Sequence, residues 1–115
     1  MKFALLLFDP GNHWDSISQE ETGAALAEHE AFARYLRERG TAFSGEALEP
    51  AKEARSLRPS GRKPVVADGP FVPLRQEPAG HHLIGCADLD EAEEIARHCP
   101  LGAGIEIRPV RESPS

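Results

Sequence analysis

Residues 65–71 read Val65-Val66-Ala67-Asp68-Gly69-Pro70-Phe71, a short apolar strand that runs directly into a turn. Asp68 ends the apolar run, Gly69 allows a backbone conformation that other residues avoid, and Pro70 fixes φ and stops the strand. Phe71 follows as an apolar anchor. The segment has two interpretations: it orients the Asp68 carboxylate, or it is an ordinary loop after an edge strand. The second interpretation is open because Gly and Pro are common in turns of every kind.

The size and composition of the chain predict one soluble domain over residues 1–115, with an ordered core at about 2–110. The net charge of −6 argues against a general binder of nucleic acid or anionic membranes, since such proteins need clustered positive charge. Cys86 and Cys99 fall in apolar patterns, so we interpret them as small buried hydrophobic residues in a reducing compartment. The apolar run at 3–8 is too short for a signal peptide or a membrane span, which predicts a cytoplasmic protein without a membrane partner.

The pattern of apolar residues predicts alternating strands and helices. Residues 18–39 form the main predicted helix, with Ser18 and Glu21 as a capping box and Gly40 as its stop. The other predicted elements are strands over 3–8, 41–48 (interrupted at Gly45-Glu46), 80–87 and 105–110, a hairpin of 51–57 and 64–67, a loop over 72–78 and a helix over 88–99.

The order β-α-β, hairpin, β-α-β is that of an α+β fold, the ferredoxin-like split βαβ with a β-hairpin insert. The strand at 3–8 is apolar on both faces and must be covered on both sides. Two helices cover only one of these faces. We therefore expect a second subunit to cover the other, which predicts a homodimer.

Three segments together point to a family. They are Asp68-Gly69-Pro70-Phe71, the N-terminal Met1-Lys2-Phe3-Ala4-Leu5-Leu6-Leu7 and the C-terminal Ile105-Glu106-Ile107-Arg108-Pro109-Val110. In this order and spacing the chain resembles the YCII-related family, in its DGPF-domain branch, over roughly residues 2 to 110. The resemblance implies a dimeric α/β barrel, in which two sheets pack back to back. It also implies a bacterial protein, in a branch whose members often occur beside stress-type sigma factors.

His29 lies near the middle of the apolar face of the main predicted helix, so we expect it to point toward the sheet. It is either a hydrogen-bonded core histidine or a titratable group in a sheltered cleft. The resemblance implies that His29 and Asp68 form the catalytic pair of the family. A carboxylate beside an imidazole fixes its tautomer and stabilises the imidazolium, which makes an acid or base that works near pH 7.

Three further residues are predicted to line the same cleft and bind a small-molecule ligand: Trp14, Phe71 and His82. His81 and His82 are neighbours on a strand and point to opposite faces, so they do not readily bind one metal ion together. The chain has no zinc spacing motif and no nucleotide-binding motif. We therefore predict no metal and no cofactor.

Two positions depart from the family pattern. Pro73 stands where an acidic residue tends to follow the tetrapeptide, and His81-His82 replace a pair of aromatic residues. Three functions stay open. The leading one is a cofactor-free lyase, isomerase or hydrolase that acts on a small organic molecule through His29. The alternatives are a non-enzymatic ligand-binding or regulatory module associated with stress-type sigma factor signalling, and a structural dimer whose cleft is filled by side chains.

Overall fold

The computed structural model describes residues 1–10, 18–72 and 75–112. Its helices and strands follow the predicted order. They are β1 (Lys2–Pro10), α2 (Gln19–Arg39), β2 (Phe43–Ala47), the short 3-10 helix η1 (Ala51–Glu53), β3 (Arg55–Arg58), β4 (Val65–Asp68), β5 (Gln76–Gly85), α3 (Leu89–Ala96) and β6 (Gly104–Pro109).

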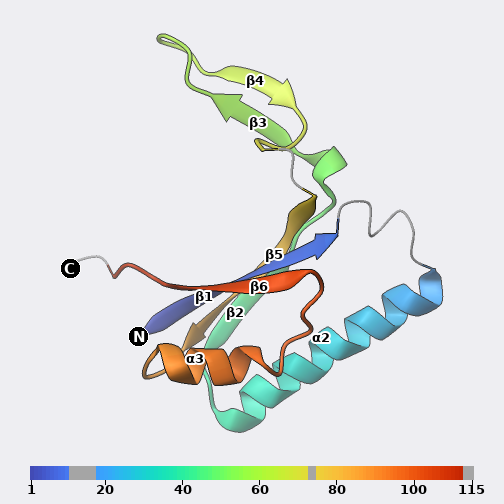
Figure 1. The fold of residues 1–115 in the computed structure, drawn as a ribbon, viewed down its shortest axis with the longest axis vertical. Coiled ribbons are helices and arrows are strands. Elements are labelled where there is room, and N and C mark those ends of the chain that lie inside the picture. Colours follow the sequence, from blue (N-terminus) through green and yellow to red (C-terminus); the bar gives the residue numbers. More distant parts are fainter. Residues whose placement is uncertain (11–17, 73–74, 113–115) are drawn as a thin grey trace.

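Four strands form an antiparallel sheet in the order β2-β5-β1-β6, and β3 pairs with β4 in a separate two-stranded hairpin. Each helix joins two strands that are not neighbours in the sheet, which is consistent with the predicted ferredoxin-like α+β fold. Helices α2 and α3 lie on the same side of the sheet (Figure 1). The core fills the space between them and the sheet, and its buried side chains are Phe3, Leu5, Phe32, Leu36, Ile84, Ala92, Ile95, Ala96 and Cys99.

The ends of α2 follow the predicted signals. The Ser18 side chain accepts a hydrogen bond from the Glu21 backbone N–H at 3.1 Å, and Gly40 closes the helix with a left-handed φ of 77°. Only the second half of α2 is buried, through Phe32 and Leu36. A helix of 21 residues is about 31 Å long, and its first half extends beyond the part of the sheet that its buried residues cover.

Several predicted boundaries are wrong. The first strand of the hairpin, predicted over 51–57, begins at Arg55, and Ala51–Glu53 form the 3-10 helix η1. Strand β2 runs without a break through Gly45. Strand β5 begins at Gln76 rather than at residue 80. Pro78 lies at the point where the β1–β5 register shifts, between Leu7 and Phe8. A bulge of this kind accommodates proline, which has no backbone N–H to donate. Helix α3 ends at Ala96, three residues earlier than predicted, because the ring of the proline at position 100 disfavours helical backbone just before it.

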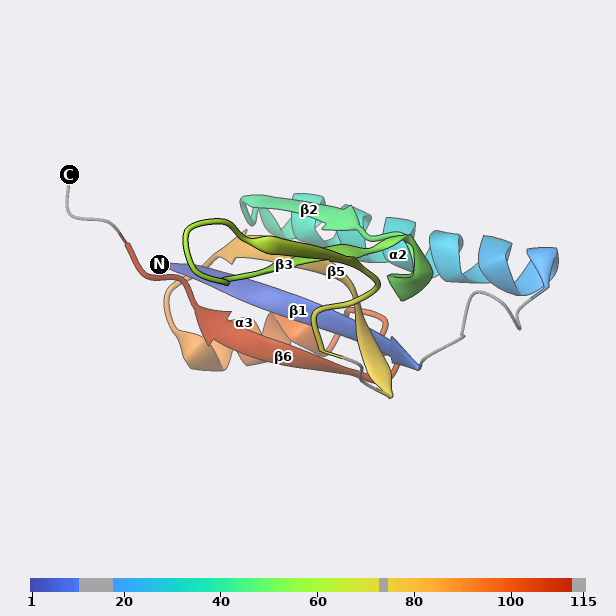
Figure 2. The same cartoon turned by 90° about the horizontal axis from the view of Figure 1, so that it is seen from above.

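The predicted hairpin is confirmed and projects from the end of the sheet where β1 finishes. We call residues 55–72 the arm. Two perpendicular views show the arm on the side of the sheet opposite to the helices (Figures 1 and 2). The radius of gyration is 16.3 Å, against about 13 Å for a compact domain of this length, so the arm stands clear of the body of the molecule.

Candidate functional site

A pocket of about 370 Å³ opens between α2 and the end of the sheet. We call it the His29 pocket. Its walls come from β1, α2, β2, β5 and the turn before β6. The described residues that line it are Leu7, Phe8, Asp9, Ala25, Leu26, Glu28, His29, Gly45, Glu46, Ala47, Ala79, His82, Pro100, Leu101 and Gly102.

His29 is exposed and forms part of the pocket wall. The alternative of a packed core histidine is therefore wrong. The helix face was predicted correctly, since Phe32 and Leu36 on the same face are buried. One to two turns earlier, the same face meets the pocket instead of the sheet, and Leu26 there is 59% exposed. The third interpretation, a cleft filled by side chains, does not describe this pocket.

His82 comes to the same pocket from β5, where it pairs with Leu5 of β1. It is half-buried, and its ring stands edge-on to the Phe32 ring with 5.2 Å between the ring centroids. Burial lowers the pKa of His82 below its usual 6.5, and the nearby charges of His29 and His81 lower it further. The ring is therefore neutral at pH 7.

The Nδ1 atom of His82 is buried and has no hydrogen-bond partner among the described residues. It lies against Gly45 of β2, where an added Cβ would come within 2.5 Å of Nδ1. Gly45 therefore leaves room for the imidazole ring beside the neighbouring strand. The sequence analysis treated Gly45 as a break in the strand, whereas it permits this close approach. The other ring nitrogen, Nε2, is the one left to meet an occupant of the pocket.

Asp9 is a pocket residue that the sequence analysis did not single out. It is half-buried near the end of β1, and its carboxylate lies so close to Gly102 that a Cβ there would be 2.5 Å from Oδ1. Asp9 follows an apolar strand directly, as Asp68 does. The same signal marks both carboxylates, and the sequence does not tell which strand end meets the helix.

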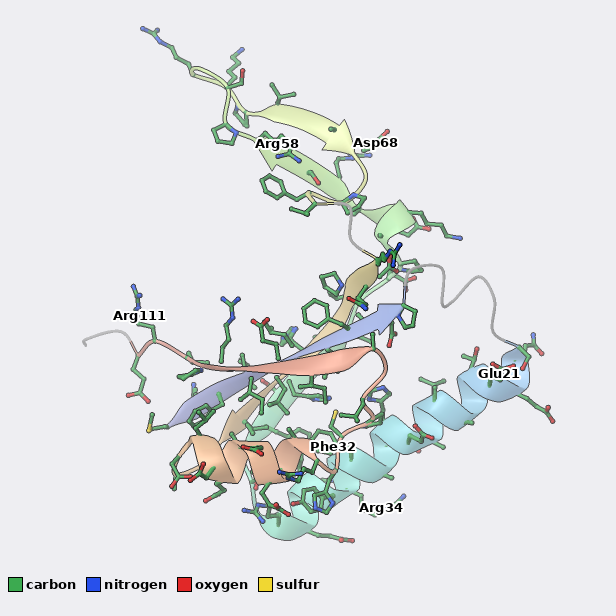
Figure 3. All side chains as sticks on the ribbon, in the orientation of Figure 1. Glu21, Phe32, Arg34, Arg58, Asp68 and Arg111 are labelled. Carbon is green, nitrogen blue, oxygen red and sulfur yellow. The ribbon has the colours of Figure 1, made fainter. Side chains whose placement is uncertain are left out.

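Asp68 and Phe71 belong to the arm and do not line the pocket. The Asp68 side chain is 96% exposed, and its carboxylate lies 3.7 Å from Nε of Arg55. Phe71 packs under the Arg58 guanidinium, whose carbon is 4.1 Å from the ring centroid. Figure 3 shows Asp68 and Arg58 on the arm, across the sheet from Phe32 of α2. The remaining predicted ligand residue, Trp14, lies outside the described residues.

Comparison with known proteins identifies the family. The model of the YCII-related domain matches residues 1–114. This chain belongs to the YCII-related family. It is also 32% identical over 114 residues to an uncharacterized protein of Rhizobium meliloti (strain 1021), in a match that covers 96% of this chain and 92% of the relative. The resemblance stated from the sequence is therefore confirmed at the level of the family.

A second hollow of this YCII-related chain, of about 470 Å³, lies at the base of the arm. The described residues that line it include three carboxylates, Glu49, Glu53 and Glu77, and otherwise apolar side chains. They include no histidine, the side chain best suited to proton transfer near neutral pH. The His29 pocket is the better candidate for chemistry, although it is the smaller of the two.

Neither described cysteine of the YCII-related chain suits nucleophilic catalysis. Cys99 is buried, which raises the pKa of its thiol to about 12, and burial also raises the pKa of Cys86. Over residues 1–10, 18–72 and 75–112, no cluster of three or more His, Cys, Asp or Glu side chains is arranged to hold a metal ion. Within those ranges no helix has the length and apolar character needed to cross a membrane.

Proposed function

We propose that this protein binds a small organic molecule in the His29 pocket, and that His29 transfers a proton to or from it as a cofactor-free lyase, isomerase or hydrolase. One observation carries the proposal: an exposed imidazole and a neutral, half-buried imidazole share one open pocket of about 370 Å³. Small-molecule sites commonly have volumes of about 300 to 1,000 Å³. Imidazole is also the side chain best suited to proton transfer near neutral pH.

The charges around the pocket support a neutral or cationic ligand with an apolar body. Asp9, Glu28 and Glu46 contribute to its lining, and no Lys or Arg is among its described lining residues. An anionic ligand would meet these carboxylates without a compensating cation. Apolar side chains supply most of the remaining wall, namely Leu7, Ala25, Leu26, Ala47, Ala79, Pro100 and Leu101.

In this proposal the two histidines have different roles. His29, exposed at the wall, exchanges the proton with the ligand. His82 keeps a neutral ring and positions the ligand through Nε2, because its Nδ1 is covered by β2. Since buried N–H groups without partners are rarer than buried acceptors without partners, we assign the proton of His82 to Nε2. His82 then donates a hydrogen bond to a carbonyl, ester or ether oxygen of the ligand.

The pairing of His29 with Asp68 stays a prediction. Within one chain, Asp68 lies on the arm beside Arg55, whereas Asp9 is one of the three described acidic residues that line the pocket with His29. The two assignments are separated by Asp9→Asn and Asp68→Asn, which remove one charge each without changing size. We expect Asp9→Asn to weaken the binding of a cationic ligand and Asp68→Asn to leave it unchanged.

A matched set of three fragments tests the pocket. Benzylamine, benzyl alcohol and benzoate share one ring and differ in charge. NMR spectra of the histidine ring protons are recorded as each fragment is added, and exposed His98 serves as the internal control. We expect the amine and the alcohol to shift the His29 and His82 signals and benzoate to shift them less. Binding that leaves both signals in place, or no binding at all, would contradict the proposal.

The proposed chemistry is tested on panels of neutral esters and lactones. General acid–base catalysis by one group commonly contributes about 10²- to 10⁴-fold to a rate. We therefore expect His29→Gln to reduce any turnover found by roughly that factor. Turnover that survives in His29→Gln would assign the chemistry to another residue.

We also propose that the working form is a homodimer with the architecture of a dimeric α/β barrel. The support comes from the helix-free face of the sheet. This face carries the half-buried side chains Ala4, Leu6 and Phe8 of β1 and Leu83 of β5. No described helix covers them (Figure 1). Two copies that pack these faces together would bury an apolar strip on each.

The arm favours a second candidate function, a regulatory module that binds a partner protein. Its apolar side chains form a surface separate from the pocket and from the sheet face, and Leu57 and Val66 are each 57% exposed. In a module of this kind, loss of His29 would leave the effect on the partner intact. The regulatory function gains support if the chain is a monomer in solution, because the apolar surface of the arm would then bind a different protein.

A further inference from the structure

We propose that the arm is a clasp that grips a second copy of this chain. The proposal rests on the homodimer described above and assigns the arm a part in holding it together. The arm exposes an unusual amount of apolar surface for so short a segment. Its exposed apolar side chains are Leu57 (57%), Val65 (53%), Val66 (57%), Phe71 (51%) and Val72 (51%).

The arm has a fixed shape despite this exposure. The hydroxyl of Ser56, a buried polar residue, donates a hydrogen bond of 2.7 Å to the carbonyl of Gly69, and the Gly69 N–H donates to the carbonyl of Ala54 at 2.8 Å. The Arg58 side chain covers the Phe71 ring and donates to the Phe71 carbonyl. An isolated two-stranded hairpin is at best marginally stable in water. An apolar surface that is ordered in this way and exposed to solvent indicates a binding partner.

The position of the arm indicates where that partner lies. Both views place the arm on the helix-free side of the sheet (Figures 1 and 2). A second copy packed against the helix-free face would therefore stand beside the arm. The two-fold symmetry of such a dimer would give each copy one arm against the other.

The size of the sheet face supports a role for the arm. The four strands hold 9, 5, 10 and 6 residues. At about 3.3 Å per residue and about 4.8 Å between strands, their footprint is roughly 480 Å². A standard stable interface buries about 800 Å² on each partner. The helix-free face alone is somewhat more than half of that area, and the arm offers the additional apolar surface.

Charge also favours a second copy over another kind of partner. The arm carries Arg55, Arg58, Arg62 and Lys63 against Asp68, a net charge of +3. The whole chain has a net charge of −6, so the rest of the chain carries −9. A basic arm thus fits the acidic body of an identical molecule, and opposite charges guide the two into register.

The test measures the dimer dissociation constant of the full chain by sedimentation equilibrium. Leu57→Glu with Val66→Glu changes exposed arm residues, so the fold of each subunit is retained; circular dichroism checks this. The matched apolar control is Leu89→Glu, at a residue of α3 that is 50% exposed and lies on the helix side. We expect the arm variant to weaken the dimer by roughly 100-fold or more, since two apolar side chains are lost on each copy, and the control to leave it unchanged.

A charge variant provides an independent test of the clasp. Arg62→Glu with Lys63→Glu reverses two charges at the turn of the hairpin, and Arg34→Glu with Arg37→Glu makes the same change on α2. We expect roughly tenfold weakening at low salt for the arm variant, the size of about two exposed ion pairs, and less at high salt. The α2 variant should bind like wild type.

The outcomes separate this inference from the proposals on which it rests. Leu83→Glu disturbs the sheet face without touching the arm. If the dimer is lost in Leu83→Glu but keeps its affinity in both arm variants, the homodimer stands and the clasp is overturned. A wild-type chain that stays monomeric at high concentration overturns both and leaves the His29 pocket unaffected. Loss of affinity in both arm variants, with Leu89→Glu and the α2 charge variant unchanged, supports the clasp.

Discussion

The replacement of Gly45 by alanine tests the geometry of the site at its tightest point. Gly45 lies opposite His82 in the β2–β5 ladder. A Cβ added there would come within 2.5 Å of the His81 carbonyl oxygen and within 2.5 Å of His82 Nδ1. Ordinary contacts at such a Cβ begin at 3.4 Å, so both atoms must move by about 1 Å.

One of these two atoms belongs to the backbone ladder and cannot move alone. We therefore expect Gly45→Ala to lower the free energy of unfolding by about 1 to 3 kcal/mol, the usual range for overpacking. In a domain of this size that corresponds to a fall in melting temperature of roughly 4 °C per kcal/mol. The His82 ring should also be displaced, which changes its NMR signal and weakens ligand binding in the His29 pocket.

The assay is urea and thermal unfolding at one fixed protein concentration, because an oligomer has a concentration-dependent melting temperature. Gly23→Ala is the matched control. Apart from its chain neighbours and the backbone of α2 itself, no described atom lies within 4 Å of a Cβ at Gly23, and alanine there should stabilise the helix by up to about 1 kcal/mol. The geometry described for His82 would be refuted if Gly45→Ala kept wild-type stability and an unchanged His82 signal.

Three further predictions concern the thiols, the pH dependence and the core. A thiol reagent such as Ellman's reagent should modify Cys86 slowly and Cys99 only after unfolding, because Cys99 is 4% exposed with a thiol pKa raised to about 12; fast labelling of both in the native protein would contradict the packing. Burial lowers the pKa of His82 in the folded state. Below pH 6.5, His82 is therefore protonated to a greater extent in the unfolded chain than in the folded chain. Stability should therefore fall from pH 7 to 5, and it should fall less steeply in His82→Leu; equal slopes in the two proteins would argue against a buried neutral ring. Leu36→Ala should reduce the free energy of unfolding by about 2 to 5 kcal/mol, as for a fully buried leucine, while Leu26→Ala, at a residue 59% exposed, should change it by no more than about 0.5 kcal/mol; similar losses at both would mean that α2 is buried along its whole length.

The fold was largely predictable because local signals agree with it. The capping box at Ser18 and the stop at Gly40 define α2, and β-branched residues before Asp68 mark the hairpin strand. The errors lie where two segments meet. The bulge that admits Pro78 into β5 depends on its pairing with β1, and the place of Gly45 depends on the ring of His82 in the next strand. The residue pattern within one strand does not reveal its contacts with a neighbouring strand.

The site was predicted in part. The helical period placed His29 correctly on the inner face of α2, and strand alternation separated His82 from His81. The sequence did not show that only the second half of α2 is buried, so that the position of His29 becomes part of a pocket wall. It also did not distinguish Asp9 from Asp68, since both follow apolar strands. Only the three-dimensional arrangement shows that Asp9 lines the His29 pocket and that Asp68 belongs to the arm.

The most direct test of the central claim is a crystal structure of the full chain soaked with benzylamine or benzyl alcohol. We predict electron density for the fragment between α2 and the sheet, with a polar atom within about 3 Å of the His29 ring or of His82 Nε2. The same crystals would show whether the helix-free faces and the arms meet in a dimer. A His29 pocket closed by side chains, or fragments bound only at the base of the arm, would contradict the account.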